Sequence, residues 1–414
     1  MAGDFKEYEV EELIRDDVLL INDGYRAKNS ELSQTGIPFA RAGNIDGGFD
    51  FEDADRVPPE TLARAGLKRS QTGDVVFTSK GTVGRFAFVG DSTPEFVYSP
   101  QLCYWRSGDA SRIHPRWLFY WMNGREFFLQ FKGVAGQTDM AEYVSLRDQR
   151  AMKITLPPIA EQKAIAAVLG ALDDKIELNR RMNATLEAMA RALFSNWIQS
   201  HDDEIGEQLV QDLIDERVLI IGDGYRAKNS EFADDGLPFI RAGNLRGDGL
   251  DLAGADVLSA SSVKAAGHKV GMVGDVAFTS KGTVGRITRV SSKTGSFVYS
   301  PQVCFWRSTA PDKLHPNVLY RWMSTDDFTH QVATVSTQTD MAPYVSLQDQ
   351  RKMVIQLPPP SAQMEIATQL EAIDEKIAAN AEQSRTLAIL RDTLLPKLLS
   401  GELAVPPALG KVNS

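Results

Sequence analysis

The strongest constraint on the fold is that the chain contains much of its sequence twice. The nonapeptide DGYRAKNSE occupies residues 23–31 and again residues 223–231. FTSKGTVGR begins at residues 77 and 278, and QTDMAEYVSLRDQR from residue 137 returns as QTDMAPYVSLQDQR from residue 338. The offset grows from 200 to 201 residues where LRGDGLD replaces IDGGFD, a glycine-rich stretch in which a loop tolerates insertion. This tandem duplication predicts two domains of the same fold.

Each copy ends in a leucine and two prolines, after which the sequence changes character. The junctions read ITLPPIAEQ from residue 154 and IQLPPPSAQ from residue 355. Proline suits the first turn of a helix, and residues 159–197 and 364–399 then place apolar side chains three or four positions apart. These are Ile165, Val168, Leu169, Leu172, Ile176, Met182, Leu186, Met189, Leu193 and Trp197, then Ile366, Leu370, Ile373, Ile377, Leu387, Leu390, Leu394 and Leu398. The narrow stripes predict two long helices that pair as a coiled coil.

Polar residues interrupt both stripes near their middles. They are Asn179 and Asn183 in the first stretch and Asn380 and Ser384 in the second. Two interpretations stay open, because such residues either set the register of a helix pair or mark where other subunits dock.

The rest of each copy mixes strand and helix signals and predicts an α+β domain of about 155 residues, a normal domain size. Residues 73–89 predict a strand, a glycine turn and a second strand. Residues 96–107 predict one strand, and residues 114–131 predict one helix that begins at His-Pro. Apolar runs place several residues in the core, with both cysteines as free thiols: Cys103, Cys304, Trp105, Trp121, Trp306 and Trp322.

Composition narrows the class of protein. The net charge of −10 argues mildly against a nucleic-acid partner, but phosphate binding needs a local basic surface rather than a basic total. The acidic start MAGDFKEYEVEEL does not resemble a secretory signal, and no apolar run approaches the roughly 20 residues that span a bilayer. We therefore expect a cytoplasmic protein without a membrane partner.

The motif order resembles the DNA-specificity subunit of type I restriction–modification systems over about residues 1–400. The resemblance rests on GDVVFTSKGTVGR and GDVAFTSKGTVGR, on LPPIAEQKAI and LPPPSAQMEI at the start of each long stretch, and on LLPKLLSGEL at the end of the second. ALFSNWI at the end of the first stretch matches less well, and the second start has Ala-Gln where the first has Glu-Gln.

The resemblance implies a function for each part of the chain. Each globule would be a target-recognition domain that reads one half of a bipartite site in double-stranded DNA, and the two helices would form an antiparallel, pseudo-two-fold coiled coil between them. Two methyltransferase subunits would supply S-adenosylmethionine and catalysis, nuclease-translocase subunits would join for cleavage, and this chain would need no cofactor. The implied bounds are 1–156 and 201–357 for the domains, 157–200 and 358–400 for the helices, and 401–414 for a flexible tail.

Candidate DNA contacts are the cations, amides and hydroxyls of the duplicated loops. Arginine and lysine suit guanine and phosphate, and asparagine suits adenine. The nonapeptide supplies Arg26, Lys28, Asn29, Arg226, Lys228 and Asn229; the alternative is a turn whose cations are merely solvated. FTSKGTVGR supplies Ser79, Lys80, Ser280 and Lys281.

Two further motifs are weaker candidates. RAGN supplies Arg41, Asn44, Arg241 and Asn244, where the alternative is an arginine in a structural ion pair. QTDM supplies Gln137, Thr138, Gln338 and Thr339, whereas Asp139 and Asp340 would repel phosphate. Tyr98, Gln101, Tyr299 and Gln302 either contact DNA or pack.

Catalytic and metal-binding motifs are missing from the sequence, which has no HExxH, no paired CxxC and no phosphate-binding glycine loop. This favours a DNA-reading module that is not an enzyme. The alternatives are a DNA-modifying enzyme with an unrecognised site, and a scaffold with two copies of a protein-binding domain. Since both copies carry the same candidate contacts, we expect an interrupted palindrome or near-palindrome as the DNA site.

Overall fold

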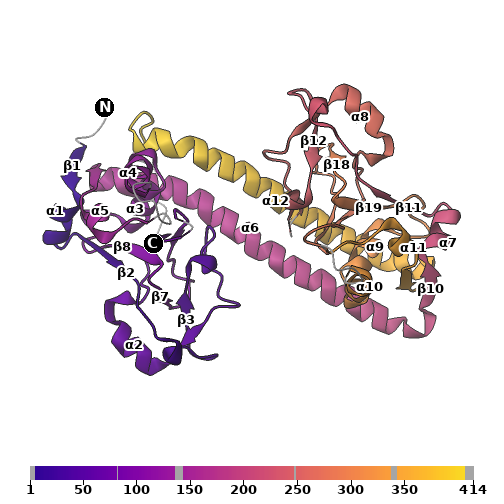
Figure 1. Ribbon diagram of the computed structural model, residues 1–414, viewed down its shortest axis with the longest axis horizontal. Coiled ribbons are helices and arrows are strands. Elements are labelled where there is room, and N and C mark those ends of the chain that lie inside the picture. The colour runs from indigo at the N-terminus through magenta and orange to yellow at the C-terminus, as the bar shows by residue number, and fades with distance from the viewer. Residues whose placement is uncertain (1–4, 82, 136–142, 247–248, 337–342, 406–414) are drawn as a thin grey trace. The chain divides into compact units, whose positions relative to one another are not determined.

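The computed structural model describes residues 5–81, 83–135, 143–246, 249–336 and 343–405. The chain divides into two compact units, Met1–Asp174 with Leu387–Ser414, and Lys175–Thr386. Each unit contains one globule and a segment of each of two long helices, α6 (Ile159–Ser200) and α12 (Pro360–Leu399). Figure 1 follows this order by colour along the chain.

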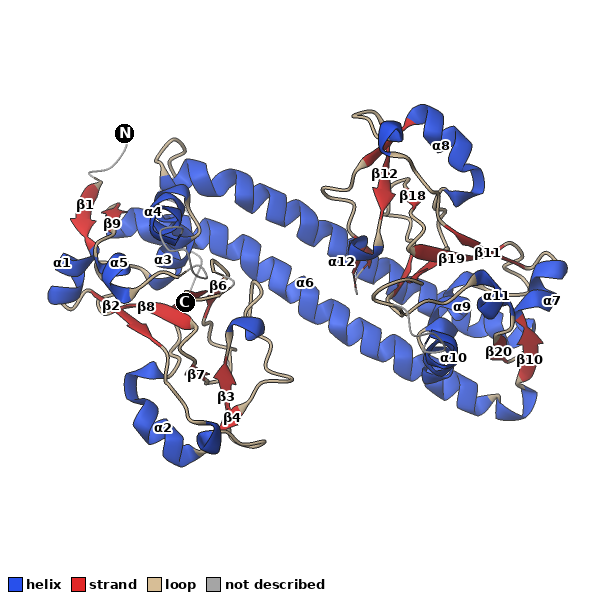
Figure 2. Ribbon diagram, viewed as in Figure 1, coloured by secondary structure: helices blue, strands red, loops and turns tan. Residues whose placement is uncertain are grey.

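The first globule is built on a four-stranded antiparallel sheet of order β2-β8-β5-β6. A three-stranded sheet of order β4-β3-β7 and a β1-β9 pair complete its strands. Figure 2 shows these strands with the short helices that surround them. The bounds are β1 Lys6–Glu9, β2 Leu19–Asp23, β3 Ile37–Ala40, β4 Arg56–Val57, β5 Val75–Thr78, β6 Phe86–Phe88, β7 Val97–Tyr98, β8 Leu102–Ser107, β9 Lys153–Leu156, α1 Val10–Arg15, α2 Pro59–Ala65, α3 Pro115–Met122, α4 Arg125–Ala135 and α5 Leu146–Arg150.

The second globule repeats this topology as β11-β19-β16-β17, β15-β12-β18 and β10-β20, with one added hairpin, β13-β14. The duplication in sequence is therefore a duplication of fold. The bounds are β10 Gly206–Leu209, β11 Leu219–Asp223, β12 Gly236–Ile240, β13 Leu245–Arg246, β14 Gly249–Leu250, β15 Val257–Ser259, β16 Val276–Thr279, β17 Ile287–Arg289, β18 Val298–Tyr299, β19 Val303–Ser308, β20 Val354–Leu357, α7 Val210–Asp215, α8 Ala260–Ala266, α9 Pro316–Met323, α10 Asp326–Ser336 and α11 Leu347–Arg351.

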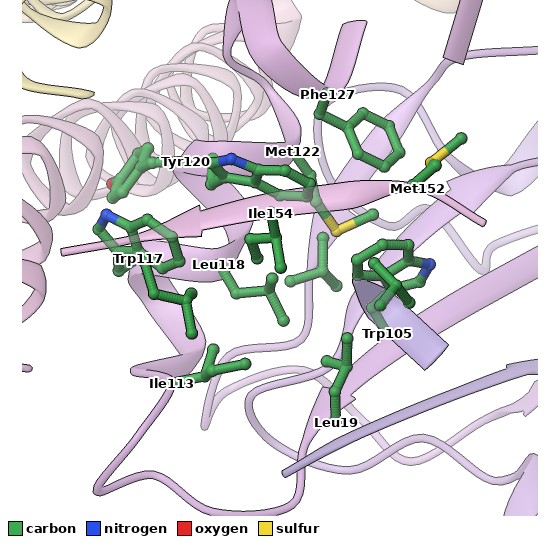
Figure 3. Packing of buried hydrophobic residues seen from close by; sticks show 14 of the residues in the cluster. Leu19, Trp105, Ile113, Trp117, Leu118, Tyr120, Met122, Phe127, Met152 and Ile154 are labelled. Carbon is green, nitrogen blue, oxygen red and sulfur yellow. The ribbon is translucent and has the colours of Figure 1, made fainter. Parts of the chain in front are cut away.

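Aromatic side chains fill the core of the first globule. The rings of Trp105 and Trp121 lie 5.9 Å apart, and the Trp105 indole donates a 2.9 Å hydrogen bond to Gln149. Figure 3 shows Trp105, Phe127 and Ile154 within this cluster, which also takes in Leu169 of α6. All four tryptophans predicted as core are buried, and the free thiols of Cys103 and Cys304 are buried as predicted. Burial raises the pKa of both thiols.

The predicted strand–turn–strand of residues 73–89 is confirmed as β5 and β6. The single strand predicted at 96–107 is wrong, because Ser99–Gln101 form a turn, closed by a 2.9 Å hydrogen bond from Leu102 N–H to the Ser99 carbonyl. That turn sends β7 and β8 into different sheets.

The single helix predicted at 114–131 is also wrong. It is interrupted between α3 and α4, where the Asn123 side chain donates a 2.8 Å hydrogen bond to the Phe119 carbonyl. A Cβ at Gly124 would lie 2.5 Å from Leu399 Cδ1, so a larger residue there would force the Leu399 side chain of α12 to shift. The predicted start at His-Pro is confirmed in both copies, with His114 and His315 as N-caps.

The two long helices are confirmed and run antiparallel within each unit. In the first unit Arg391 of α12 contacts Asp173 of α6 at 2.8 Å, and in the second unit Asn380 of α12 contacts Asn183 of α6 at 2.8 Å. Two residues assigned to the apolar stripes are exposed instead, Met189 at 55% and Leu390 at 44%. Among the described helices, none combines the length and apolarity that crossing a membrane requires.

Candidate nucleic-acid interface

The nonapeptide begins where β2 ends, and its first residues fix the backbone. Lys68 Nζ donates hydrogen bonds to Asp23 Oδ1 (2.7 Å) and to the Gly24 carbonyl (2.8 Å). A Cβ at Gly24 would lie 1.9 Å from the Ser99 carbonyl oxygen, so only glycine fits there. In the second globule Lys269 holds Asp223 and Gly224 in the same way.

Glu31 closes the other end of the loop. Its carboxylate accepts hydrogen bonds from the Lys28 backbone N–H (2.8 Å) and the Tyr25 hydroxyl (3.1 Å), and it pairs with Arg64 (2.8 Å). The Lys28 N–H is the largest of the influences that lower the pKa of Glu31. Glu231 repeats the contacts to Lys228 and Tyr225.

The remaining polar residues of the nonapeptide point to solvent. Arg26, Lys28 and Asn29 are exposed, and within the described part of the chain their side chains form no hydrogen bond or ion pair. The same holds for Arg226, Lys228 and Asn229. The nonapeptide thus combines residues that hold the loop backbone in shape with residues whose side chains are exposed to solvent.

The FTSKGTVGR motif forms the β5–β6 hairpin. Lys80 is exposed there, without a hydrogen bond or ion pair to any described residue, and Lys281 Nζ lies 4.6 Å from the ring centre of Tyr344. Ser79 and Ser280 are each 1% exposed, and their hydroxyls donate to the carbonyls of Gln101 and Gln302. The prediction that these serines contact DNA conflicts with their burial, and we assign them a structural role.

The polar side chains of the RAGN motif mainly contact the backbone and acids of their own loop. Asn44 Oδ1 accepts a 2.8 Å hydrogen bond from Arg41 N–H, and Asn44 Nδ2 donates to the Asp50 carbonyl at 2.9 Å. Arg41 pairs with Asp55 at 2.7 Å, and in the second globule Arg241 pairs with Asp256 at 2.6 Å. Asn244 repeats the Asn44 contacts. The ion-pair interpretation fits both arginines, and both asparagines are occupied by the backbone.

Four predicted contacts cannot be placed, since Gln137, Thr138, Gln338 and Thr339 lie outside the described residues, as do Asp139 and Asp340. Tyr98 and Tyr299 pack in the core, where their hydroxyls donate to Asp74 (2.5 Å) and Asp275 (2.9 Å).

The loops meet at one end of the main sheet. Ser79 N–H donates to the Gln101 carbonyl (2.9 Å), Val144 N–H donates to the Ser79 carbonyl (3.0 Å), and Ala42 N–H donates to the Gln101 side chain (3.3 Å). Because β2 and β5 both run antiparallel to β8, their carboxyl ends lie beside the start of β8. The nonapeptide, the hairpin, RAGN and the segment at Val144 therefore share one surface.

Two residue pairs on this surface are not among the DNA contacts predicted from sequence. Tyr143 and Tyr344 are 45% and 44% exposed and form isolated bridges with Lys80 and Lys281. Burial is the main influence that raises the Tyr143 pKa, while the nearby charge of Arg26 acts in the opposite sense. Arg85 and Arg286 are exposed at the end of the hairpin. The sequence carried one signal for these residues, because the tyrosine and the arginine recur at equivalent positions of the two copies.

Comparison with known proteins agrees with this architecture. Residues 6–188 match the family model described as the type I restriction modification DNA specificity domain. The MjaIX specificity subunit of Methanocaldococcus jannaschii is 25% identical over 306 residues, which is 70% of this chain and 69% of that protein. Both matches make the chain similar to the type I DNA specificity subunits.

Two other relatives of this family differ in how much they cover. The HindI specificity subunit of Haemophilus influenzae is 28% identical over 137 residues, 33% of this chain and 30% of that protein. The crystal structure of the type I S subunit from M. genitalium covers 96% of both chains, with a TM-score of 0.58 and 14% identity, and supports the specificity-subunit fold.

Proposed function

We propose that this chain is a specificity subunit that reads a bipartite DNA site with the two loop surfaces, one per globule, and performs no catalysis itself. The observation that carries this proposal is that both globules expose the same three nonapeptide side chains on the same frame: Arg26, Lys28 and Asn29 in the first, and Arg226, Lys228 and Asn229 in the second. In a chain of net charge −10, the cations Arg26, Lys28, Lys80 and Arg85 gather where the loops converge. A local basic surface of this kind is what phosphate binding requires.

The chemistry of the presented groups suits base edges as well as phosphates. Arginine and lysine donate to guanine O6 and N7, and asparagine exchanges two hydrogen bonds with adenine. Glu31 and Lys68 hold the backbone of the loop, and the side chains of Arg26, Lys28 and Asn29 form no hydrogen bond or ion pair with any described residue, so their donors can meet DNA. Side chains of one type on one frame should read the same bases, which favours an interrupted palindrome or near-palindrome.

Partner subunits complete the proposed function. We propose that two methyltransferase subunits bind the helices and that nuclease-translocase subunits join the complex in the cytoplasm. Met189 and Leu390 support two equivalent docking positions, since they are 201 residues apart, occupy matching places in α6 and α12, and are both exposed. We propose domain bounds of 1–156 and 201–357, which the starts of α6 at Ile159 and α12 at Pro360 support.

The test is to assemble the chain with the methyltransferase subunits of its host and to sequence the DNA that the complex methylates. We expect one motif with two specific halves and a non-specific spacer. Turnover of DNA by the isolated chain would favour an enzyme instead. Absence of DNA affinity, even in the assembled complex, would favour a protein-binding scaffold.

A further inference from the structure

The two loop surfaces differ in charge just after the RAGN motif. The nonapeptide, RAGN and FTSKGTVGR are identical in the two copies, but the second residue after RAGN is Asp46 in the first globule and Arg246 in the second. Residue 142, where the copies also differ, lies outside the described residues. The stretch 247–248, which gives the second copy Asp248, also lies outside the described residues. The change from Asp46 to Arg246 is therefore the charge difference within the described part of these two loops.

The backbone at this position is anchored in both globules. Ile45 and Leu245 are 0% and 2% exposed and pack into the cores beneath the loop. In the first globule Ile45 bridges Phe49, and in the second Arg246 pairs with Gly249. The buried Ile45 and Leu245 hold the backbone from which the Asp46 and Arg246 side chains extend. A side chain that selects a base needs a fixed backbone of this kind.

Both side chains reach solvent beside the hairpin. Arg85 donates a 3.4 Å hydrogen bond to the Ile45 carbonyl, which places the Asp46 loop next to a cation of the surface. Asp46 is exposed and its carboxylate has no hydrogen bond or ion pair among the described residues. The Arg246 side chain is 60% exposed and approaches Asp251 only at 3.8 Å, too far for a hydrogen bond. This long ion pair with Asp251 leaves most of the Arg246 side chain exposed to another acceptor.

The two side chains favour opposite partners. An arginine donates to guanine O6 and N7, whereas an aspartate accepts from cytosine N4 and is repelled by phosphates. We propose that Asp46 and Arg246 are specificity-determining residues that make the two half-sites differ at one base pair within an otherwise repeated word. This inference rests on the proposed function and names the residues that make the two half-sites depart from a perfect palindrome.

The experiment uses the assembled methyltransferase complex and a library of duplexes in which both half-sites are randomised. Wild type should select half-sites that differ at one base pair. Asp46→Arg should make the halves equal there, and Arg246→Asp should give the second half the preference of the first, each with a change of about tenfold or more at that base pair. The double exchange should swap the two half-sites.

A matched control separates base reading from net charge. Asp91 is exposed and follows β6, so it lies toward the opposite end of the sheet from the loop surface. Asp91→Arg makes the same charge change and should leave the selected sequences unaltered. Identical wild-type half-sites, or variants that change affinity for every sequence alike, would overturn the inference and leave the proposed function standing. A wild-type complex that selects no sequence would instead remove the proposed function.

Discussion

Asn380 donates a 2.8 Å hydrogen bond to Asn183, and the duplication places an equivalent contact, with a serine as acceptor, on the other side. Asn179, which lies 201 residues before Asn380, donates a 3.2 Å hydrogen bond to Ser384, which lies 201 residues after Asn183. The helix pair therefore has local two-fold symmetry at its polar centre. Of the two interpretations of these polar residues, register setting is supported by this contact between the helices.

We expect Asn380→Leu to lower the free energy of unfolding by about 1–3 kcal/mol, because it leaves the buried Asn183 side chain without its donor. Adding Asn183→Leu should recover part of this loss, since an apolar pair replaces an unsatisfied polar group. Denaturant midpoints of the two single variants and the double variant measure the coupling. Strictly additive losses would show that the contact contributes nothing.

The double variant Lys28→Ala with Lys228→Ala should weaken DNA binding by the assembled complex. If the lysines grip phosphates, affinity falls for all sequences and the dependence of log Kd on log salt flattens by about 1 per lysine; if they read bases, each costs about 1–3 kcal/mol at one base pair. Fluorescence anisotropy at several salt concentrations separates these cases. Lys6→Ala, on the β1–β9 pair, is the control, and binding as strong as wild type in the double variant would contradict the assignment.

Glu31→Gln with Glu231→Gln should weaken DNA binding even though it makes the protein less acidic. The carboxylate holds the backbone of Lys28, so its loss should loosen the loop that presents the cations. The lowered pKa of Glu31 means that this stabilisation is present at neutral pH and is lost as the pH falls through the carboxyl range. Tighter binding in the variant would show that total charge outweighs loop geometry.

Tyr143→Ala with Tyr344→Ala should reduce affinity for DNA several-fold, since Lys281 would lose the ring beneath its ammonium group. Replacement of both tyrosines by phenylalanine keeps the ring and isolates the hydroxyl. Unchanged binding in the alanine variant, with its thermal stability preserved, would remove the tyrosines from the interface.

The parts of the fold with a long or repeated signal were predictable from sequence. Both long helices and the β5–β6 hairpin follow from periodicity and glycine placement. The breaks at Ser99–Gln101 and Asn123–Gly124 were missed because they depend on tertiary contacts, such as that of Gly124 with Leu399. Within the site, Lys28 is exposed, as a DNA contact must be, whereas Ser79 is buried beside the Gln101 carbonyl. No local sequence pattern predicts the burial of Ser79. Tyr143 was missed because its contact with Lys80 joins segments far apart in sequence.

The division of labour within the nonapeptide bears on how new specificities can arise. Asp23, Gly24 and Glu31 hold the loop in shape, whereas the side chains at positions 26, 28 and 29 form no hydrogen bond or ion pair with any described residue. Changes in those three codons should therefore alter the DNA word while the loop keeps its shape, and each gene half can acquire them separately. A randomised library confined to these codons should yield folded subunits with altered target preferences. The loop could then change the bases that it recognises without a change of fold.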